Sequence, residues 1–432
     1  MNRNRTVLYQ KIYDDFKEKI TNGWYEAHSK LPSIRQAAKN NGLSTTTIEH
    51  AYQQLSIEGY IYSLPKSGYY VEDLTFVEIQ KSADIGDETT YRPALNQRQT
   101  KDMFNLNRVR MIMNRVLTDN DQLYEDCHPT GELALKKEIQ KHLAKQRNVL
   151  LRPQQMIVAS GTQQLIMWLS SMFDSHTCVA YLKPGFKRAL QAFKTTGFRC
   201  MGQNTVDDLI RAEAKIIFIS PSNLYPSGDV LPVKERLKLI RYAQDNDAYI
   251  IEDDYNHMFR YNAYQIPTIH QLSKGHNVIY IGSFSRNTLL SIRMSYMGLP
   301  LALVSDVNHS LFAQSVSKID QLMMADFLSS GEYQKHLRQL ARYSKKRNDN
   351  LKIALDPWMD ANHFSISGLQ SNMHLLITCY NQATKAKFIK NLENLNFAYT
   401  TFEANPRLLL IPYSGIPMHR FETLFNTLFA GI

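Results

Sequence analysis

The segment SGTQQ, residues 160–164, is a first candidate for chemistry, because it joins a strand-like run to the helix-like run LIMWLSSMF. Glycine lets the backbone approach a bound group closely, and the first turn of a helix offers free N–H groups to a phosphate. Many strand-to-helix turns share this pattern. The segment therefore predicts an anion site only in combination with other motifs.

Further motifs with reactive or recognition residues follow in order along the chain. Phe186 in KPGF offers a flat apolar face, and the other motifs are PSNLYPSG (221–228), EDDYNHMFRY (252–261), GSFSRNTLLSIR (282–293) and NPRLLLIPYSG (405–415). Taken singly, Asp253 is equally well a helix cap or an ion-pair partner, and Phe186 a core side chain. Convergent polar groups favour one shared binding site.

The elements that must position these motifs are an alternation of strand-like and helix-like segments after about residue 104. Continuous apolar runs between helical patterns indicate buried parallel strands in an α/β sheet. The candidate strands are 156–160, 178–182, 215–220, 249–254 and 278–283.

The first 71 residues have a different pattern. Apolar residues recur every four positions over 8–20 and predict one helix. Pro32 and Ser33 favour the start of a second helix, Asn41-Gly42 a tight turn, and Ser44 the cap of a third. Helix, short turn and helix is the helix-turn-helix arrangement, and the hairpin YIYSLPKSGYYV would be a wing.

The third helix of this module would present polar side chains to a DNA major groove. These are Thr45, Thr46, Thr47 and His50, with Lys66 and Gly68 at the wing tip. The net charge through residue 71 is only +3, from nine basic and six acidic side chains. A single module would therefore bind DNA weakly, and pairing on a dimer would help. A small helical interaction domain is the alternative interpretation.

The bulk composition is that of a folded protein with more than one domain. The chain has 432 residues, 44% of them hydrophobic, and a formal net charge of +10, which favours an anionic partner. Its four cysteines are far apart, and His257 and His270 lack metal-ligand spacing, so we expect no metal. The charged N-terminus and the lack of an 18-residue apolar run predict a cytoplasmic protein.

Residues 7–71 resemble the GntR-type winged helix-turn-helix through LPSIRQAA, GLSTTTIEHAYQQL, EGY and KSGYYV. The ordered motifs after residue 104 resemble the fold-type I aminotransferase domain. The whole chain thus resembles the MocR/GabR family of bacterial transcriptional regulators. The resemblance implies a DNA-binding domain at 1–73, a linker at 74–103, and an effector-binding and dimerisation domain at 104–432. Residues 305–432 would form a smaller α+β subdomain.

The resemblance also implies roles for individual residues. Asp253 would face the ring nitrogen of pyridoxal phosphate, Tyr255 its hydroxyl, and Phe186 its flat face, where the family usually has Tyr. The phosphate would be held by Gly161, Thr162, Ser283, Ser285 and Arg293. Tyr225 replaces the Asn of catalytic aminotransferases, and Arg407 matches the arginine that binds a ligand carboxylate. Arg35 and Ser44 join the predicted DNA-contacting residues, although Thr45 stands where the family often has Arg.

Arg286 is the departure that decides the predicted function, because it occupies the position of the lysine that forms a Schiff base with the cofactor. A guanidinium stays protonated and is a poor nucleophile, whereas a desolvated lysine amine can attack an aldehyde. We therefore expect no catalytic residue. Pyridoxal phosphate would bind non-covalently or as a preformed aldimine with an amino acid, unless the cofactor has been lost in favour of another anion.

Three hypotheses follow from these motifs. The first is a homodimeric regulator of double-stranded DNA that senses a small anionic or amino-acid-like effector without catalysis. The alternative is a pyridoxal-phosphate-dependent enzyme with an accessory DNA-binding module. The third is a structural dimer that holds two winged helices without any ligand.

Overall fold

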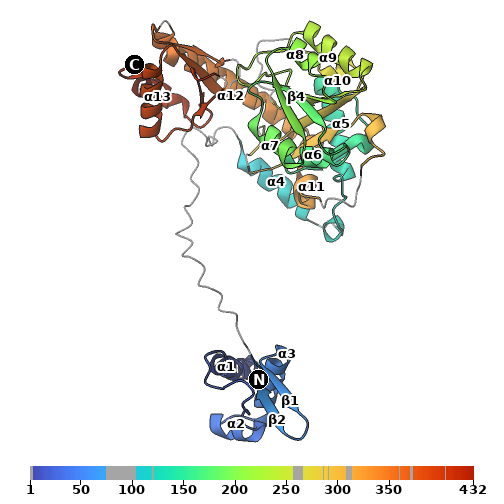
Figure 1. Cartoon of the computed structure of the whole chain (residues 1–432), viewed down its shortest axis with the longest axis vertical. Coiled ribbons are helices and arrows are strands. Elements are labelled where there is room, and N and C mark those ends of the chain that lie inside the picture. Colours follow the sequence, from blue (N-terminus) through green and yellow to red (C-terminus); the bar gives the residue numbers. More distant parts are fainter. Residues whose placement is uncertain are drawn as a thin grey trace. The chain divides into compact units, whose positions relative to one another are not determined.

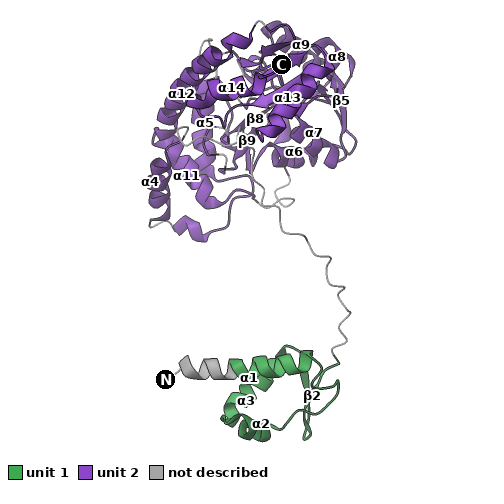
Figure 2. Ribbon diagram, turned by 90° about the vertical axis from the view of Figure 1, so that its left-hand side faces the viewer, with its two compact units in different colours: residues 1–91 green, residues 92–432 purple. Residues whose placement is uncertain are grey.

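The structure is a computed structural model. It describes residues 3–73, 104–118, 121–255, 266–285, 287–289, 291–307, 314–359, 361–369, 373–403 and 405–432. The predicted linker, 74–103, and Arg286 lie outside these residues. The chain divides into two compact units, residues 1–91 and 92–432 (Figure 2).

The N-terminal unit is a three-helix module with a two-stranded hairpin. Its elements are α1 (Arg3–Thr21), α2 (Ile34–Asn41), α3 (Thr45–Ile57), β1 (Ile61–Leu64) and β2 (Gly68–Val71), and the two strands pair antiparallel. Tyr52 of α3 lies at the centre of the core: it is fully buried, its ring meets Phe16 edge-on, and its hydroxyl donates to the Pro32 carbonyl at 2.9 Å. The predicted helix-turn-helix and wing are confirmed.

Local hydrogen bonds explain where the helices of this unit begin and end. The Ser33 and Ser44 hydroxyls accept the backbone N–H of Gln36 and Thr47, each at 3.2 Å, and so cap α2 and α3. Gly42 closes α2 in the left-handed region, at φ 63°, where a residue without Cβ is favoured.

A seven-stranded sheet forms the centre of the second unit, in the order β3-β9-β8-β7-β6-β4-β5. The strands are β3 (Met156–Ala159), β4 (Cys178–Leu182), β5 (Arg199–Gln203), β6 (Ile216–Ile219), β7 (Tyr249–Asp253), β8 (Val278–Ser283) and β9 (Ser295–Gly298). Strands β5, β4, β6, β7 and β8 run parallel, whereas β9 is antiparallel to both β8 and β3. The predicted α/β class is confirmed, and the sheet is mixed where we expected parallel strands.

Helices cover both faces of this sheet, which explains why its strands are apolar throughout. On β6, Ile216 and Phe218 pack in one core cluster with residues of α6 (Thr162–Ser170) and α7 (Lys187–Thr195), whereas Ile217 packs in another with residues of α8 (Val206–Arg211) and α9 (Val233–Asp245). Figure 1 shows the helices arranged around this sheet. The helices of this part are α4 (Leu106–Leu117), α5 (Leu133–Arg147), α6 (Thr162–Ser170), α7 (Lys187–Thr195), α8 (Val206–Arg211), α9 (Val233–Asp245), α10 (Ile269–Leu272) and α11 (Lys318–Ser329).

The C-terminal part of the second unit is a smaller antiparallel sheet with helices. Its elements are α12 (Glu332–Leu355), β10 (Phe364–Ser367), β11 (His374–Cys379), α13 (Gln382–Asn394), β12 (Thr400–Thr401), β13 (Leu408–Pro412) and α14 (Phe421–Phe429), and the strand order is β10-β11-β13-β12. Short 3-10 helices lie at Asp121–Tyr124, Pro153–Gln155, Leu301–Leu303, Asp356–Trp358 and Met418–Arg420. Within the described residues, no helix is long and apolar enough to cross a membrane.

Candidate ligand-binding site

A cavity of about 820 Å³ lies at the carboxyl ends of the parallel strands, the edge at which open α/β sheets bind ligands. Loops after β4, β6, β7 and β8 line it from the larger sheet, and residues at the start of β11 and from the middle of β13 onward line it from the smaller sheet. Every predicted cofactor-site residue that the structure describes lines this cavity: Gly161, Thr162, Phe186, Tyr225, Asp253, Tyr255, Ser283, Ser285 and Arg293.

One end of the cavity is rich in donors suited to a phosphate. Helix α6 begins at Thr162, and Gly161 before it has φ 147°. A Cβ on Gly161 would lie only 2.8 Å from the Arg293 Nη2 atom, so the absent side chain is what lets the guanidinium lie against the start of the helix. Free N–H groups at a helix N-terminus and an arginine fork are an established combination for binding phosphate.

Ser283 and Ser285 complete this end of the cavity. The Ser283 hydroxyl accepts the Ser285 backbone N–H at 3.3 Å and the Ser295 hydroxyl at 3.0 Å. The Ser285 hydroxyl in turn accepts the Met294 N–H at 3.3 Å. These bonds fix the turn between β8 and β9, so that two hydroxyl groups line the cavity beside Arg293. Ser295 also lines the cavity, and sequence reasoning did not select it.

Asp253 ends β7 and places a carboxylate in the cavity wall, with a residue exposure of only 4%. Two residues further on, the Tyr255 hydroxyl accepts the Asn223 side-chain amide at 3.0 Å and lies 3.3 Å from the Asn223 carbonyl, to which it can donate. Asn223 was not predicted, although its motif, PSNLYPSG, was noted for Tyr225. Its side chain positions the Tyr255 ring rather than lining the cavity.

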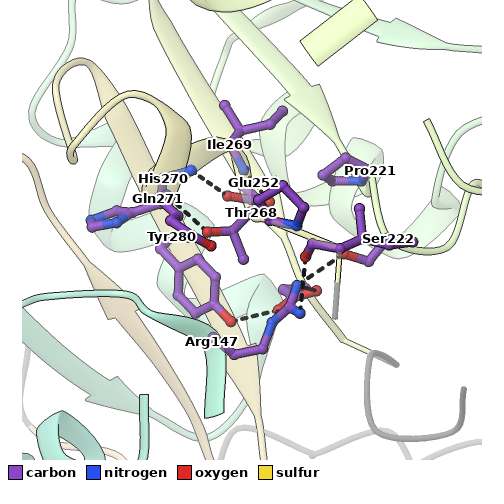
Figure 3. A network of polar contacts seen from close by, with 12 residues as sticks. Arg147, Pro221, Ser222, Glu252, Thr268, Ile269, His270, Gln271 and Tyr280 are labelled. Carbon is purple, nitrogen blue, oxygen red and sulfur yellow. Dashed lines mark hydrogen bonds and ion pairs between the residues drawn. The ribbon is translucent and has the colours of Figure 1, made fainter. Parts of the chain in front are cut away.

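A buried polar network lies behind Asp253, on the other face of β7, because adjacent strand residues point to opposite faces. The Arg147 guanidinium donates to both carboxylate oxygens of Asp254, at 2.7 and 3.2 Å. It also donates to the Ser222 hydroxyl at 3.1 Å (Figure 3). The Tyr280 hydroxyl donates to Asp254 at 2.6 Å. One side chain of α5 thus joins the end of β7 to the loop that carries Asn223 and Tyr225.

Glu252 is the second acid of this network. Its two carboxyl oxygens accept the backbone N–H groups of Ile269 and His270, at 2.9 and 2.8 Å, at the start of α10 (Figure 3). Burial, followed by the nearby charge of Asp254, raises the pKa of the Glu252 carboxyl to about 7. Arg147 could not have been selected from the sequence, because KQRNV has no distinguishing pattern.

The smaller sheet supplies a wall of different character. It consists of Met373, His374, Leu410, Pro412 and Ser414. Leu410 packs in a cluster with Leu376 and Phe402, which the Tyr225 ring also joins. The His374 Nε2 atom lies 2.7 Å from the Pro226 carbonyl, so the ring must donate its Nε2 hydrogen there.

Arg407 does not reach the cavity. It lies before β13, is exposed, and is not among the cavity-lining residues. Alternation along β13 places Leu410 and Pro412 on the cavity side, whereas Leu409 and Ile411 are fully buried in the core of the smaller sheet. The predicted carboxylate-binding role of Arg407 therefore has no support in this arrangement. Leu410, three residues later, is a residue of the same motif that does line the cavity, together with Pro412 and Ser414.

The residues predicted to contact DNA lie mainly on α3 and its cap and on the hairpin of the N-terminal unit, and Arg35 lies in the first turn of α2. Arg35, Thr45, Thr46, His50 and Lys66 are exposed. Ser44 and Thr47 also bond to each other through their hydroxyls, at 2.8 Å, so both help to cap α3. Lys66 has φ 63° and Gly68 φ 121°, which form the tight tip of the wing.

Comparison with known proteins finds a family match for each of the two units. Residues 8–71 match the gntR family of bacterial regulatory proteins, and residues 100–408 match the aminotransferase class I and II family. The HTH-type transcriptional regulator YdeL of Bacillus subtilis is 30% identical over 398 residues, which cover 87% of this chain and 86% of YdeL. The rhizopine catabolism regulatory protein MocR of Rhizobium meliloti is 26% identical over 373 residues, covering 79% of this chain and 75% of MocR.

Among solved structures, the kynurenine aminotransferase of Pyrococcus horikoshii matches with a TM-score of 0.68 and 18% identity, over 76% of this chain and 87% of that chain. At this identity the match shows the fold-type I fold alone. The chain therefore belongs to the GntR-type transcriptional regulators that carry an aminotransferase-like domain, the MocR type. The GntR region implies DNA binding, and proteins with the aminotransferase-like fold generally bind pyridoxal phosphate.

Proposed function

We propose that the cavity of this regulator binds a pyridoxal-type phosphate without a covalent link and uses it as a signal, not as a coenzyme for turnover. One observation supports this most strongly. The groups that we expect to bind phosphate and a buried carboxylate converge in one cavity, while the chain has arginine where the resemblance places the Schiff-base lysine.

The residues present fit such a group. The contact between Arg293 and Gly161 leaves the guanidinium and the first N–H groups of α6 directed at an anion. Asp253 would hold a proton on a ring nitrogen, and Phe186 would cover one ring face. When bound, the cofactor supplies an electrophilic aldehyde and an electron-poor ring. Arg286 has no neutral amine to attack that aldehyde or to carry a proton to and from a substrate.

The signal would pass through the two sheets that share the cavity. A ligand that touches both walls stabilises the arrangement in which they lie together, and it shifts the population of states by its difference in affinity between them. Tyr225 supports this proposal, since it belongs to the larger-sheet side but packs with Phe402 and His374 at ring distances of 6.0 and 6.1 Å.

We also propose that two chains pair through the aminotransferase-like unit. Large apolar side chains on α4 and on the neighbouring 3-10 helix are exposed, with Leu106 at 59%, Met111 at 64% and Tyr124 at 93%. Large exposed apolar groups on neighbouring elements favour a protein partner. Pairing would present two winged helices at a high effective concentration, which offsets the weak charge of each module.

Binding of purified full-length protein to DNA with paired half-sites, selected from a random pool, tests this proposal. We expect specific, salt-sensitive binding whose affinity changes when pyridoxal phosphate is added. Borohydride treatment should leave no cofactor attached to the protein. A covalently trapped cofactor together with turnover of an amino donor would instead establish the enzyme alternative, which the retained Asp253 and Tyr255 favour. If DNA affinity does not change when the ligand is added, the remaining hypothesis is a structural dimer that holds two winged helices without any ligand.

A further inference from the structure

The cavity has two chemically different sides, and the difference restricts its ligand. The larger-sheet side provides Arg293, Asp253 and several hydroxyl groups, and the cations Lys183 and Arg188, both exposed, also belong to it. The smaller-sheet wall, by contrast, contains neither lysine nor arginine among the described residues that line the cavity.

Leu410 is the residue that gives this wall its character. It is 5% exposed and packs with Leu376, which is 4% exposed, and with Phe402, which is 8% exposed. Strand register holds it there, since Leu410 pairs with Leu376 across β13 and β11. Leu410 cannot exchange places with Arg407, because Arg407 precedes the first residue of β13, Leu408, whereas the strand pairing fixes Leu410 within β13.

The described polar groups of the smaller-sheet wall provide no charged partner for a ligand carboxylate beside this apolar patch. The His374 Nε2 hydrogen is donated to the Pro226 carbonyl at 2.7 Å, and Ser414 provides a neutral hydroxyl. A carboxylate held against Leu410 would lose its water without gaining a charged partner from the described residues of this wall, which is unfavourable. An apolar group in the same place would be favoured, because it would bury its surface against Leu410 and the Tyr225 ring.

We infer that Leu410 makes this cavity selective for a phosphorylated pyridoxal-type ligand that carries no amino-acid carboxylate. The cavity would therefore exclude adducts of the cofactor with amino acids. The ligand class is therefore the cofactor itself or its adduct with an apolar amine. This inference rests on the proposed function, since it assumes that the phosphate end of the cavity is occupied. It also rests on a register that places Arg407 outside the cavity.

Two stable probes that differ only by the carboxylate provide the test. They are the reduced phosphopyridoxyl adducts of leucine and of 3-methylbutylamine, titrated against the full-length protein beside pyridoxal phosphate. We expect the amine adduct to bind at least about tenfold more tightly than the leucine adduct. In Leu410→Arg, a charge-assisted pair should strengthen leucine-adduct binding by about 10- to 100-fold. Leu410→Met and Arg407→Ala are the matched controls, and both should keep the wild-type preference.

The outcomes separate this inference from the function on which it rests. Tight binding of pyridoxal phosphate with equal or stronger binding of the leucine adduct would overturn the selectivity and leave the proposed function standing. The selectivity would also be overturned, with the proposed function left standing, if Arg407→Ala weakened the binding of the leucine adduct but not that of the other two ligands. Failure of all three ligands to bind would overturn both. The wild-type comparison needs no variant, so a poorly folded Leu410→Arg protein would not leave the inference without a test.

Discussion

The two functional surfaces of this protein are built in opposite ways. The N-terminal module places its predicted DNA contacts mainly on a single helix, α3, and on the tip of the adjacent hairpin. The cavity takes its walls from the ends of strands in two sheets, with contributors as far apart in sequence as Gly161 and Leu410. A surface on one helix follows from local periodicity, whereas a surface assembled from many segments depends on the register of each.

The difference also concerns what stabilises each region. In the module, one apolar core around Tyr52 positions the recognition helix. Behind the cavity, buried charged groups help to position the cavity walls, because Arg147 joins α5, the end of β7 and the loop before Tyr225. Removing one member of a buried ion pair leaves the other unpaired, so the cavity should be more sensitive to single polar substitutions than the module is.

The largest expected effect is that of Arg147→Met. It removes the cationic partner of Asp254 while keeping much of the side-chain volume, and should lower the free energy of unfolding of the second unit by about 3–5 kcal/mol. Denaturant unfolding followed by tryptophan fluorescence would measure this change. Arg188→Met, at an exposed position, is the control and should stay within about 0.5 kcal/mol. Equal stability of the two variants would show that the network does not support the cavity.

The next effect is a pH dependence from Glu252. Its pKa is raised from an ordinary value of 4.5 to about 7 in the folded state, so the folded protein holds this proton more tightly than the unfolded chain does. The associated stability is fully present below about pH 4.5 and is lost as the pH rises to 7, a change of up to about 3 kcal/mol. Subtracting the pH profile of Glu252→Gln from that of the wild type should isolate this fall. A flat difference would contradict it.

Arg293→Ala should act on the cavity alone. Loss of a charge-assisted bond to phosphate corresponds to about 1.5–3 kcal/mol, or about 10- to 100-fold weaker binding of pyridoxal phosphate. DNA affinity measured without ligand should stay at the wild-type value, because the N-terminal module is intact. Unchanged ligand affinity would mean that the phosphate does not bind at the start of α6.

The smallest effect is expected in the module. Ser44→Ala removes the hydroxyl that caps α3 and should cost about 1 kcal/mol, seen as faster hydrogen exchange in the first turn of that helix. Ser63→Ala, at an exposed strand position, is the matched control. A loss of several kcal/mol from Ser44→Ala would show that the module, like the cavity, depends on single polar contacts.

Prediction from the sequence succeeded where a pattern is local. The caps at Ser33 and Ser44, the hairpin and the apolar strands were all predicted from short windows. Strands β5 and β9 were not predicted, because RCMGQ and SYMG contain glycine and polar residues and lack a continuous apolar run. Asn223 and Arg147 were missed for a different reason: their partners, Tyr255 and Asp254, lie 32 and 107 positions away.

The sequence by itself determined the two-part organisation, the winged helix-turn-helix, the α/β class and the arginine at position 286, since each depends on residue type, spacing or periodicity. Only the tertiary structure decided which side chains share the cavity. Strand register and alternation place Leu410 in the cavity wall, whereas Arg407 of the same motif precedes β13, is exposed and does not line the cavity. A motif specifies the residues that are available, whereas the face that each residue occupies depends on hydrogen bonding between strands distant in sequence.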